Sequence, residues 1–168
     1  MTAYRISFLL MLIVKVAAAQ NITQIKVGVN GLTCSACTRS VEMSLLRLDF
    51  VDSVQMCLEN TEGLIFTGKS TMDFNQIAKA VTNAGFSVRF LQAKFSFTNT
   101  GMDDNGCFKI DGNNFQWIGF QKSNTPLTLT FIDSSFLPGN QYSKWKKKLV
   151  AANCFAGQPT YHVTYLAN

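Results

Sequence analysis

The segment GLTCSACTRSVE, residues 31–42, joins a strand-like stretch to a helix-like one and holds two cysteines three positions apart. Just before it, apolar residues alternate with polar or small ones, which predicts a half-buried strand over residues 24–29. Just after it, apolar residues recur at helical spacing, which predicts an amphipathic helix over residues 37–48. The sequence therefore places Cys34 in the loop after a strand and Cys37 in the first turn of a helix.

A hairpin, a second helix and a last strand follow. The hairpin alternates on both sides of the polar turn ENTEG, at Val54, Met56, Leu58, Leu64 and Phe66. Asp73 precedes a helical pattern that stops at Gly85, and the last strand contains Phe86, Val88 and Phe90. The order strand, helix, strand, strand, helix, strand predicts an α+β fold, the ferredoxin-like βαββαβ unit with both helices on one face of a four-stranded antiparallel sheet.

The second half of the chain, residues 92–168, predicts a small β-rich domain of unknown type with one late helix. Its strand-like alternation lies at residues 93–98, 114–120 and 128–131 and at Tyr161, Val163 and Tyr165. Its helical spacing lies at Tyr142, Trp145 and Leu149. No Pro- or Gly-rich linker separates the halves, so the boundary near Leu91 leaves open whether they pack as one body.

The first residues, MTAYRISFLLMLIVKVAAAQ, are typical of an export signal. Arg5 provides a basic start, residues 6–14 an apolar run, and Ala17 and Ala19 an A-x-A cleavage site. The run is too short to cross a bilayer about 30 Å thick as a helix. We therefore expect residues 1–19 to be a signal peptide and the mature protein to be periplasmic or secreted. An uncleaved N-terminal anchor is the alternative, and membrane contact is expected only in that case.

The charge of the chain is modest. Its formal net charge is +5, and loss of Arg5 and Lys15 with the signal lowers it to +3. A charge of this size does not by itself indicate nucleic acid, and we expect no such partner. The basic cluster KWKKK, residues 144–148, is typical of a solvated helix face with Trp145 turned to the core, with contact to anionic lipid or an acidic protein as the alternative.

The Cys34 and Cys37 pair has the chemistry of a metal site. A helix start carries unpaired N–H groups and a partial positive charge, which lower the pKa of a cysteine thiol. Two thiolates from one loop suit a soft d¹⁰ ion such as Cu(I), whereas a structural zinc site takes four ligands. The only histidine, His162, is expected at the surface rather than as a ligand. A loop disulfide or two unligated thiols is the structural alternative.

The sequence around the pair resembles the heavy-metal-associated domain of copper chaperones, copper-transporting ATPases and periplasmic mercury-binding proteins. The resemblance covers residues 24–91 and rests on Gly31, Thr33, Cys34 and Cys37, on TRSVE, VDSVQMCLEN and AGF, and on the βαββαβ order. It implies that Cys34 and Cys37 carry the metal. Two positions are of special interest in this comparison: Leu32, which replaces the methionine of most members and is expected to pack under the loop, and Phe86, where soluble chaperones often have Lys or Tyr.

These observations predict an exported, monomeric, non-enzymatic protein that captures a soft ion for transfer or sequestration. Cu(I) is the favoured ion, with Hg(II) or Zn(II) as alternatives, and a donor or acceptor protein is an expected partner. The competing hypotheses are a thiol-disulfide redox protein and an interaction module with a metal-sensing domain. Against redox chemistry, no Trp precedes Cys34 and no Gly-Pro lies between the cysteines, although Pro126 could imitate the proline that faces such a pair. We find no catalytic or cofactor-binding signature.

The other three cysteines are expected to have structural roles. Cys57 alternates with Met56 and should point to the sheet face opposite the helices, where it would be a buried, slowly reacting thiol if the second half covers that face. Cys107 and Cys154 are expected to form a disulfide, since an exported protein benefits from such a bond. A second metal site is the alternative for these two residues.

Overall fold

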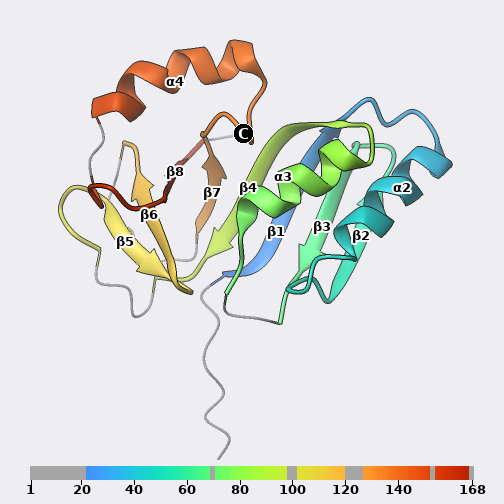
Figure 1. Ribbon diagram of the computed structural model, residues 1–168, viewed down its shortest axis with the longest axis horizontal. Helices are drawn as coiled ribbons and strands as arrows, with labels where there is room; N and C mark the ends of the chain where they lie inside the picture. The colour runs from blue at the N-terminus through green and yellow to red at the C-terminus, as the bar shows by residue number, and fades with distance from the viewer. Residues whose placement is uncertain (1–21, 69–70, 98–101, 120–126, 152–153, 167–168) are drawn as a thin grey trace, which may run out of the picture.

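The computed structural model describes residues 22–68, 71–97, 102–119, 127–151 and 154–166 (Figure 1). The first half of the described chain contains β1 (Ile22–Asn30), α2 (Ser35–Leu45), β2 (Ser53–Cys57), β3 (Glu62–Phe66), α3 (Phe74–Asn83) and β4 (Ser87–Phe95). The second half contains β5 (Cys107–Ile110), β6 (Asn113–Trp117), β7 (Leu127–Phe131), α4 (Gly139–Ala151) and β8 (Thr160–Thr164). The export signal predicted over residues 1–19 lies outside the described residues.

The first half has the predicted ferredoxin-like fold. Its strands lie in the order β2-β3-β1-β4, and α2 and α3 cover one face of them (Figure 1). Ile25, Val27 and Val29 of β1 are fully buried beneath the helices, as the alternation of the sequence predicts. The α+β prediction is thereby confirmed for this half.

The second helix begins and ends where the sequence indicates. Asp73 caps α3, because its carboxylate accepts a hydrogen bond from the Asn75 N–H at 3.0 Å. Gly85 ends the helix with a φ of +89°, a left-handed conformation that glycine adopts without steric cost. The two signals together fix the position of β4, which begins two residues later.

A bulge in β4 changes which residues face the core. Val88 lies opposite Val29, but Phe90 lies opposite Gly28, with a register shift between them. Phe90 therefore points to the face opposite the helices, whereas strict alternation would have kept it on the same face as Val88. Its ring occupies the space beside Gly28, where a Cβ atom would come within 2.4 Å of the ring. A glycine is required there by this close approach.

The second half extends the same sheet rather than forming a separate one. β4 runs through the boundary predicted near Leu91 and pairs with β7, and the complete strand order is β2-β3-β1-β4-β7-β8-β6-β5. β8 is antiparallel to β7 and parallel to β6. The predicted strands and late helix of this half are present, residues 93–95 belong to β4, and β5 was not predicted. None of the described residues forms a helix long and apolar enough to cross a membrane.

A cluster of aromatic rings joins the two halves. Phe74 of α3 lies 4.7 Å from Phe131 of β7 and 5.2 Å from Tyr161 of β8, measured between ring centroids. Phe95 of β4 lies 5.2 Å from Phe115 of β6. All of these residues except Tyr161 are buried, so the halves share one hydrophobic core.

Polar contacts reinforce this junction at the start of α3. The Tyr161 hydroxyl donates a hydrogen bond to the Asp73 carboxylate at 2.9 Å, and the Asn113 side chain donates to the Met72 carbonyl at 2.8 Å. Burial, and then the contact with Asp73, raises the pKa of Tyr161 well above its usual value. The residue that caps α3 is therefore held by the second half of the chain.

The remaining cysteines confirm one prediction and correct another. Cys107 and Cys154 form the predicted disulfide, with a Cα–Cα distance of 5.6 Å. Cys57 is free and points away from the helices, as predicted, but it is exposed rather than buried. The physical reason is that the second half continues the sheet sideways past β4 and leaves the face beside Cys57 open.

Candidate metal site

Apolar side chains hold the base of the loop between β1 and α2. Gly31 begins it with a φ of +88°, and the Leu32 side chain, 5% exposed, packs into the core as predicted. The half-buried ring of Phe86 lies beside Gly31, with its nearest carbon 3.6 Å from the position a Cβ would occupy there. The base of the loop is thus held by apolar packing, while Thr33 and Cys34 are exposed.

Cys34 is the residue that begins α2. Its backbone is extended, and its Sγ accepts a hydrogen bond from the Cys37 N–H at 3.1 Å. Its carbonyl oxygen accepts two further bonds, from the Thr38 N–H and from the Thr38 hydroxyl, both at 3.1 Å. The helix starts at Ser35, two residues before the predicted position, so that Cys37 lies in its first turn as expected.

This position favours negative charge on sulfur. Unpaired N–H groups of a helix start point toward a capping atom, and the first turn of α2 contains no acidic residue to oppose them. Arg39, the nearest basic residue along the helix, is paired with Glu42 at 2.9 Å. The backbone at the helix start is therefore the main local source of positive charge among these residues.

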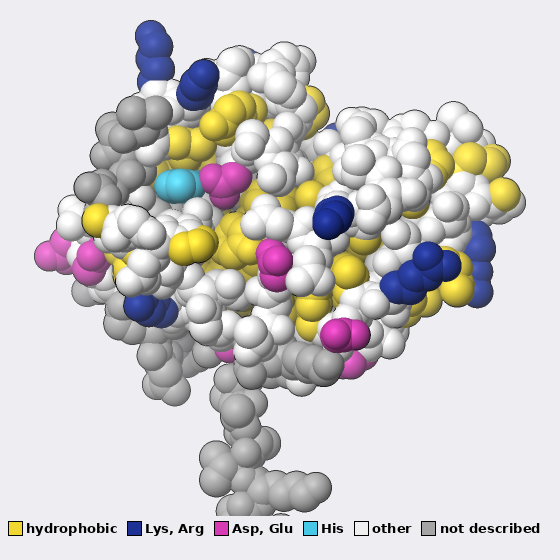
Figure 2. All heavy atoms as spheres, viewed as in Figure 1, with side chains coloured by type: hydrophobic (Ala, Val, Ile, Leu, Met, Phe, Trp, Pro, Cys, Tyr) yellow, Lys and Arg dark blue, Asp and Glu magenta, His cyan; other side chains and the backbone are white. Residues whose placement is uncertain are grey.

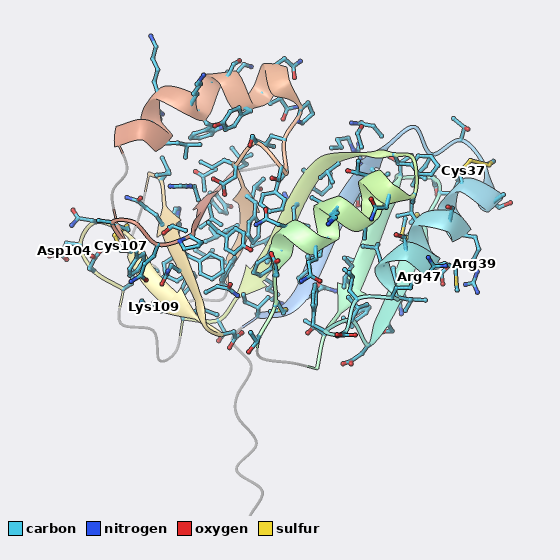
Figure 3. All side chains as sticks on the ribbon, viewed as in Figure 1. Cys37, Arg39, Arg47, Asp104, Cys107 and Lys109 are labelled. Carbon is cyan, nitrogen blue, oxygen red and sulfur yellow. A yellow bond between two sulfur atoms is a disulfide. The ribbon has the colours of Figure 1, made fainter. Side chains whose placement is uncertain are left out.

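The structure brings the two predicted site residues into contact. Cys34 and Cys37 are joined by a disulfide, with a Cα–Cα distance of 5.2 Å. Cys34 is exposed and Cys37 is partly buried, so Cys34 is the more accessible of the two. Figure 3 shows Cys37 at the start of α2, far from Cys107 at the opposite end of the molecule. Two sulfur atoms therefore converge at one exposed helix start.

No third ligand accompanies the pair within the described part of the chain. That part contains no cluster of three or more His, Cys, Asp or Glu side chains suited to holding a metal ion. Cys57 ends β2 on the opposite face of the sheet, and His162 belongs to the second half. A site at Cys34 and Cys37 would thus take its protein ligands from one loop.

His162 has a partner that the sequence did not indicate. Its Nδ1 lies 2.6 Å from Oδ1 of Asp133, and its backbone N–H donates to the other oxygen of that carboxylate at 2.9 Å. The imidazole side chain is only 18% exposed, whereas we expected a surface residue. Periodicity could not reveal this pair, because Asp133 lies beyond β7 and reaches His162 only through the pairing of β7 with β8.

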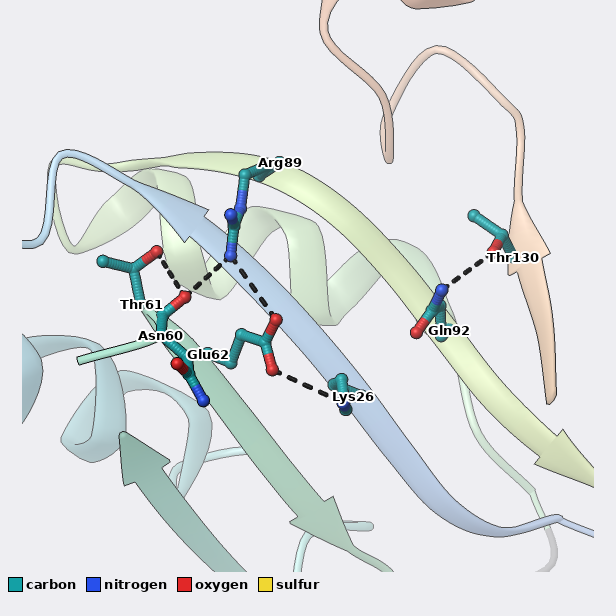
Figure 4. A network of polar contacts seen from close by, with 7 residues as sticks. All are labelled: Lys26, Asn60, Thr61, Glu62, Arg89, Gln92 and Thr130. Carbon is teal, nitrogen blue, oxygen red and sulfur yellow. Dashed lines mark hydrogen bonds and ion pairs between the residues drawn. The ribbon is translucent and has the colours of Figure 1, made fainter. Parts of the chain in front are cut away.

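A polar network on the face opposite the helices was also missed. Glu62 of β3 lies 3.4 Å from Lys26 of β1 and 3.6 Å from Arg89 of β4, and Arg89 also donates to the Asn60 carbonyl at 2.8 Å (Figure 4). These side chains lie across neighbouring strands, so the network ties the hairpin to β1 and β4. It stabilises the sheet and contains no atom of the cysteine loop.

Comparison with known proteins places these residues in a family. Residues 26–87 match the heavy-metal-associated domain. The chain is 30% identical over 70 residues to the mercuric transport protein periplasmic component of Pseudomonas fluorescens, covering 42% of this chain and 74% of that protein. It is 32% identical over 75 residues to the cation-transporting ATPase HMA5 of Oryza sativa subsp. japonica, covering 45% of this chain but only 8% of the ATPase.

Similar solved structures cover the same segment. A CopZ metallochaperone is 29% identical, with 39% of this chain and 98% of that one covered and a TM-score of 0.38. Oxidized MerP from Ralstonia metallidurans CH34 is 22% identical, with 40% and 93% covered and a TM-score of 0.37. The match of residues 26–87, and the likeness to most of the Pseudomonas fluorescens protein, show that the chain belongs to the heavy-metal-associated domain family.

Proposed function

We propose that the protein captures one soft metal ion, Cu(I), between the Cys34 and Cys37 thiolates for transfer or sequestration. The observation that carries the proposal is the convergence of two sulfur atoms at the exposed start of α2, inside a heavy-metal-associated domain. The protein acts as a carrier in this proposal and catalyses no reaction. The ion is its cargo.

Metal capture requires the reduced form of the pair. An external dithiol supplies two electrons and two protons, is itself oxidised to a disulfide, and converts the Cys34–Cys37 bond to two thiols. Binding of the ion then releases both protons as two metal–sulfur bonds form. The Cys37 N–H that reaches Cys34 Sγ in the disulfide form supports a thiolate at the same atom. The disulfide joins residues only three positions apart, so its reduction need not change the rest of the fold.

The small number of ligands favours Cu(I) over Zn(II). Soft thiolates select Cu(I), while structural Zn(II) sites are usually closed by four ligands. The absence of a further His, Cys, Asp or Glu cluster among the described residues supports a two-sulfur site. Phe86, which lies beside Gly31 at the base of the loop, is apolar and brings no positive charge that would neutralise the single negative charge of a Cu(I) bis-thiolate.

Exposure of Cys34 suits transfer by ligand exchange. An incoming thiolate of an acceptor protein attacks the bound ion from the exposed side, and a three-sulfur intermediate forms before one donor bond breaks. The bond to Cys34 breaks more readily in this scheme, because Cys37 is the more buried ligand. The acceptor is expected to carry a comparable pair of thiols.

An anaerobic competition titration tests the proposal. Reduced protein should take one Cu(I) per chain from a chromogenic chelator, while Cys34→Ser and Cys37→Ser should each lose tight binding. Leu32→Met is a matched control, because Leu32 is 5% exposed and packs beneath the loop. Full retention of affinity by the Cys34→Ser, Cys37→Ser double variant would place the metal elsewhere. Parallel titrations with Hg(II) and Zn(II) determine the preferred ion.

Export is part of the same proposal. The sequence of residues 1–19 supports it, and so does the likeness to a protein described as a periplasmic component. Intact mass of the protein from its native host should correspond to a chain that begins at Gln20. A mass that includes Met1 would overturn this part while leaving the metal site untouched.

Thiol-disulfide exchange is the second candidate function. It is favoured by one observation, the disulfide between Cys34 and Cys37 at an exposed helix start. Pro126, which could face such a pair, lies outside the described residues. A redox protein would reduce disulfide substrates repeatedly in the presence of a dithiol donor. A carrier would show no turnover, and Cu(I) would protect its two thiols from alkylation.

A further inference from the structure

We propose that the outward face of α4 is a docking surface for an anionic lipid bilayer. This helix contains Lys144, Lys146, Lys147 and Lys148 and no acidic residue along its 13 residues. It lies outside the segment that matches the heavy-metal-associated domain. The proposal is therefore independent of metal binding at the cysteine pair.

Three of the four lysines of α4 share one exposed face of the helix. Lys144, Lys147 and Lys148 are exposed and share one face of the helix, since residues three and four apart are neighbours on a helix surface. The other side carries the half-buried residues Tyr142, Trp145 and Leu149. Figure 1 shows α4 at the rim of the molecule, and basic side chains stand out from the surface there in Figure 2.

No lysine of α4 forms an ion pair with an acidic side chain among the described residues. The ion pairs found among the described residues involve Lys26, Arg39, Arg89 and His162, and none involves a lysine of α4. Lys148 instead lies over the ring of Trp145, 5.1 Å from its centroid. Several like charges held on one face create a positive potential that attracts a polyanionic surface.

A bilayer fits this face better than an acidic protein. Between the lysines the outward face offers Asn140 and Ser143, whereas a stable protein interface needs apolar or aromatic anchors at its centre. An anionic bilayer is attracted by charge alone, and each lysine near its surface strengthens binding about fivefold.

Two exposed apolar side chains follow β8 at the end of the described chain. Leu166 is 44% exposed and lines a hollow together with Leu137 and Gln141, next to the first turn of α4, and the adjacent Tyr165 is 55% exposed. Such side chains can enter the interfacial region of a bilayer while lysines contact the headgroups. The cysteine loop lies across the sheet from α4, so contact through α4 would leave that loop accessible (Figure 1).

Vesicle binding tests the proposal with the full chain. Wild-type protein should bind vesicles of equimolar phosphatidylglycerol and phosphatidylcholine in low salt, and bind pure phosphatidylcholine weakly. The variant Lys144→Gln, Lys147→Gln, Lys148→Gln should lose on the order of a hundredfold in affinity for the anionic vesicles. Added salt should weaken wild-type binding, because it shortens the range of the attraction. Any contribution of residues 1–19 is the same in every variant.

Two controls make the outcome decisive. The variant Arg47→Gln, Lys79→Gln, Lys94→Gln removes the same charge from exposed positions on other elements and should bind nearly as well as wild type. Lys→Arg changes at the three α4 positions should retain binding, and thermal melting should confirm folding of each variant. Equal losses in the two glutamine variants would overturn the proposal. So would binding of wild type to soluble polyglutamate but not to anionic vesicles, which would indicate an acidic protein.

Discussion

Cys34 and Cys37 are three residues apart at an exposed helix start, whereas Cys107 and Cys154 are 47 residues apart and join β5 to the segment after α4. Closing a long loop removes many conformations from the unfolded chain, and a loop of this length contributes roughly 4 kcal/mol in the chain-entropy model. Closing a short loop constrains little. The distant pair is therefore suited to stability, and the close pair can open without loss of the fold.

Burial separates the two pairs further. Cys107 is 9% exposed and its partner Cys154 is half-buried, so this bond is less accessible in the folded state than Cys34 is. Cys34 is exposed, and its sulfur accepts a backbone hydrogen bond from the start of α2. Sequence separation and exposure together indicate that Cys107 and Cys154 stabilise the fold, and that Cys34 and Cys37 are suited to exchange chemistry.

The largest expected effect is a loss of Cu(I) affinity, without loss of stability, when the close cysteine pair is replaced. Replacing both Cys34 and Cys37 by Ser should lower Cu(I) affinity by several orders of magnitude, because no thiolate remains in the loop. The free energy of unfolding under reducing conditions should change by less than about 1 kcal/mol, because Ser can replace Cys34 as the cap of α2 and Cys37 is only partly buried. Denaturant unfolding of apo protein, beside the metal titration, measures both quantities. A large loss of stability in this variant would show that the close pair also stabilises the fold, contrary to the contrast drawn between the two pairs.

Replacing the distant pair, Cys107 and Cys154, should lower stability and leave metal affinity unchanged. Cys107→Ala with Cys154→Ala should lower the free energy of unfolding by roughly 4 kcal/mol under oxidising conditions. Cu(I) affinity at Cys34 and Cys37 should stay the same in the fraction that remains folded. Reducing agent should remove the stability difference between wild type and variant. A metal affinity that falls together with stability would show that the two pairs are coupled.

A smaller effect is expected at the junction of the halves. Tyr161→Phe removes the hydroxyl that donates to Asp73 at 2.9 Å, and it should lower the free energy of unfolding at neutral pH by about 1–2 kcal/mol. Metal affinity should not change, because the junction does not contact the cysteine loop. Denaturant titration of the variant beside wild type provides the measurement, and an unchanged stability would contradict the role given to this contact.

The pH dependence of the same contact has a defined sign. Since the folded state raises the pKa of Tyr161, the phenol is stabilised in its neutral form, and that contribution is complete below the usual tyrosine value of about 10. It is lost as the pH rises from there through the folded-state pKa. The advantage of wild type over Tyr161→Phe should therefore be constant up to about pH 9 and smaller at about pH 11. If the stability difference between wild type and Tyr161→Phe instead grew with pH, the pKa of Tyr161 would not be raised in the folded state.

The smallest effect concerns the fifth cysteine. Cys57 is free and exposed, so a thiol reagent should modify it in the folded, non-reduced protein, whereas the four bonded cysteines stay protected. Modification should leave both Cu(I) affinity and stability nearly unchanged. Peptide mapping identifies the labelled residue. Failure of Cys57 to react would restore the prediction of a buried thiol.

The sequence predicted most of the first half because its signals are local. Alternation in β1, the Asp73 cap and Gly85 each act within a few residues, and each is observed. The bulge that turns Phe90 away from the helices was missed, because it depends on how β4 pairs with β1. The exposure of Cys57 was missed for a related reason, since it depends on where the second half lies.

In the second half, the sequence predicted most of the strands and the helix but not how the strands are ordered in the sheet. Periodicity indicated β6, β7, α4 and β8, yet it contains no information on the order of strands in a sheet. The contacts of Tyr161 with Asp73 and of His162 with Asp133 follow from that order, so neither could be predicted. The predicted pairing of Cys107 with Cys154 succeeded because the number of cysteines restricted the choice.

X-ray absorption at the copper edge of Cu(I)-loaded protein tests the central claim most directly. The Cys57→Ser variant should be used, so that the exposed fifth thiol cannot contribute. We expect two sulfur neighbours and no nitrogen or oxygen neighbour, with the signal lost when Cys34 and Cys37 are also replaced by Ser. Copper bound by nitrogen or oxygen atoms, or copper retained after both replacements, would contradict a two-thiolate site at the start of α2.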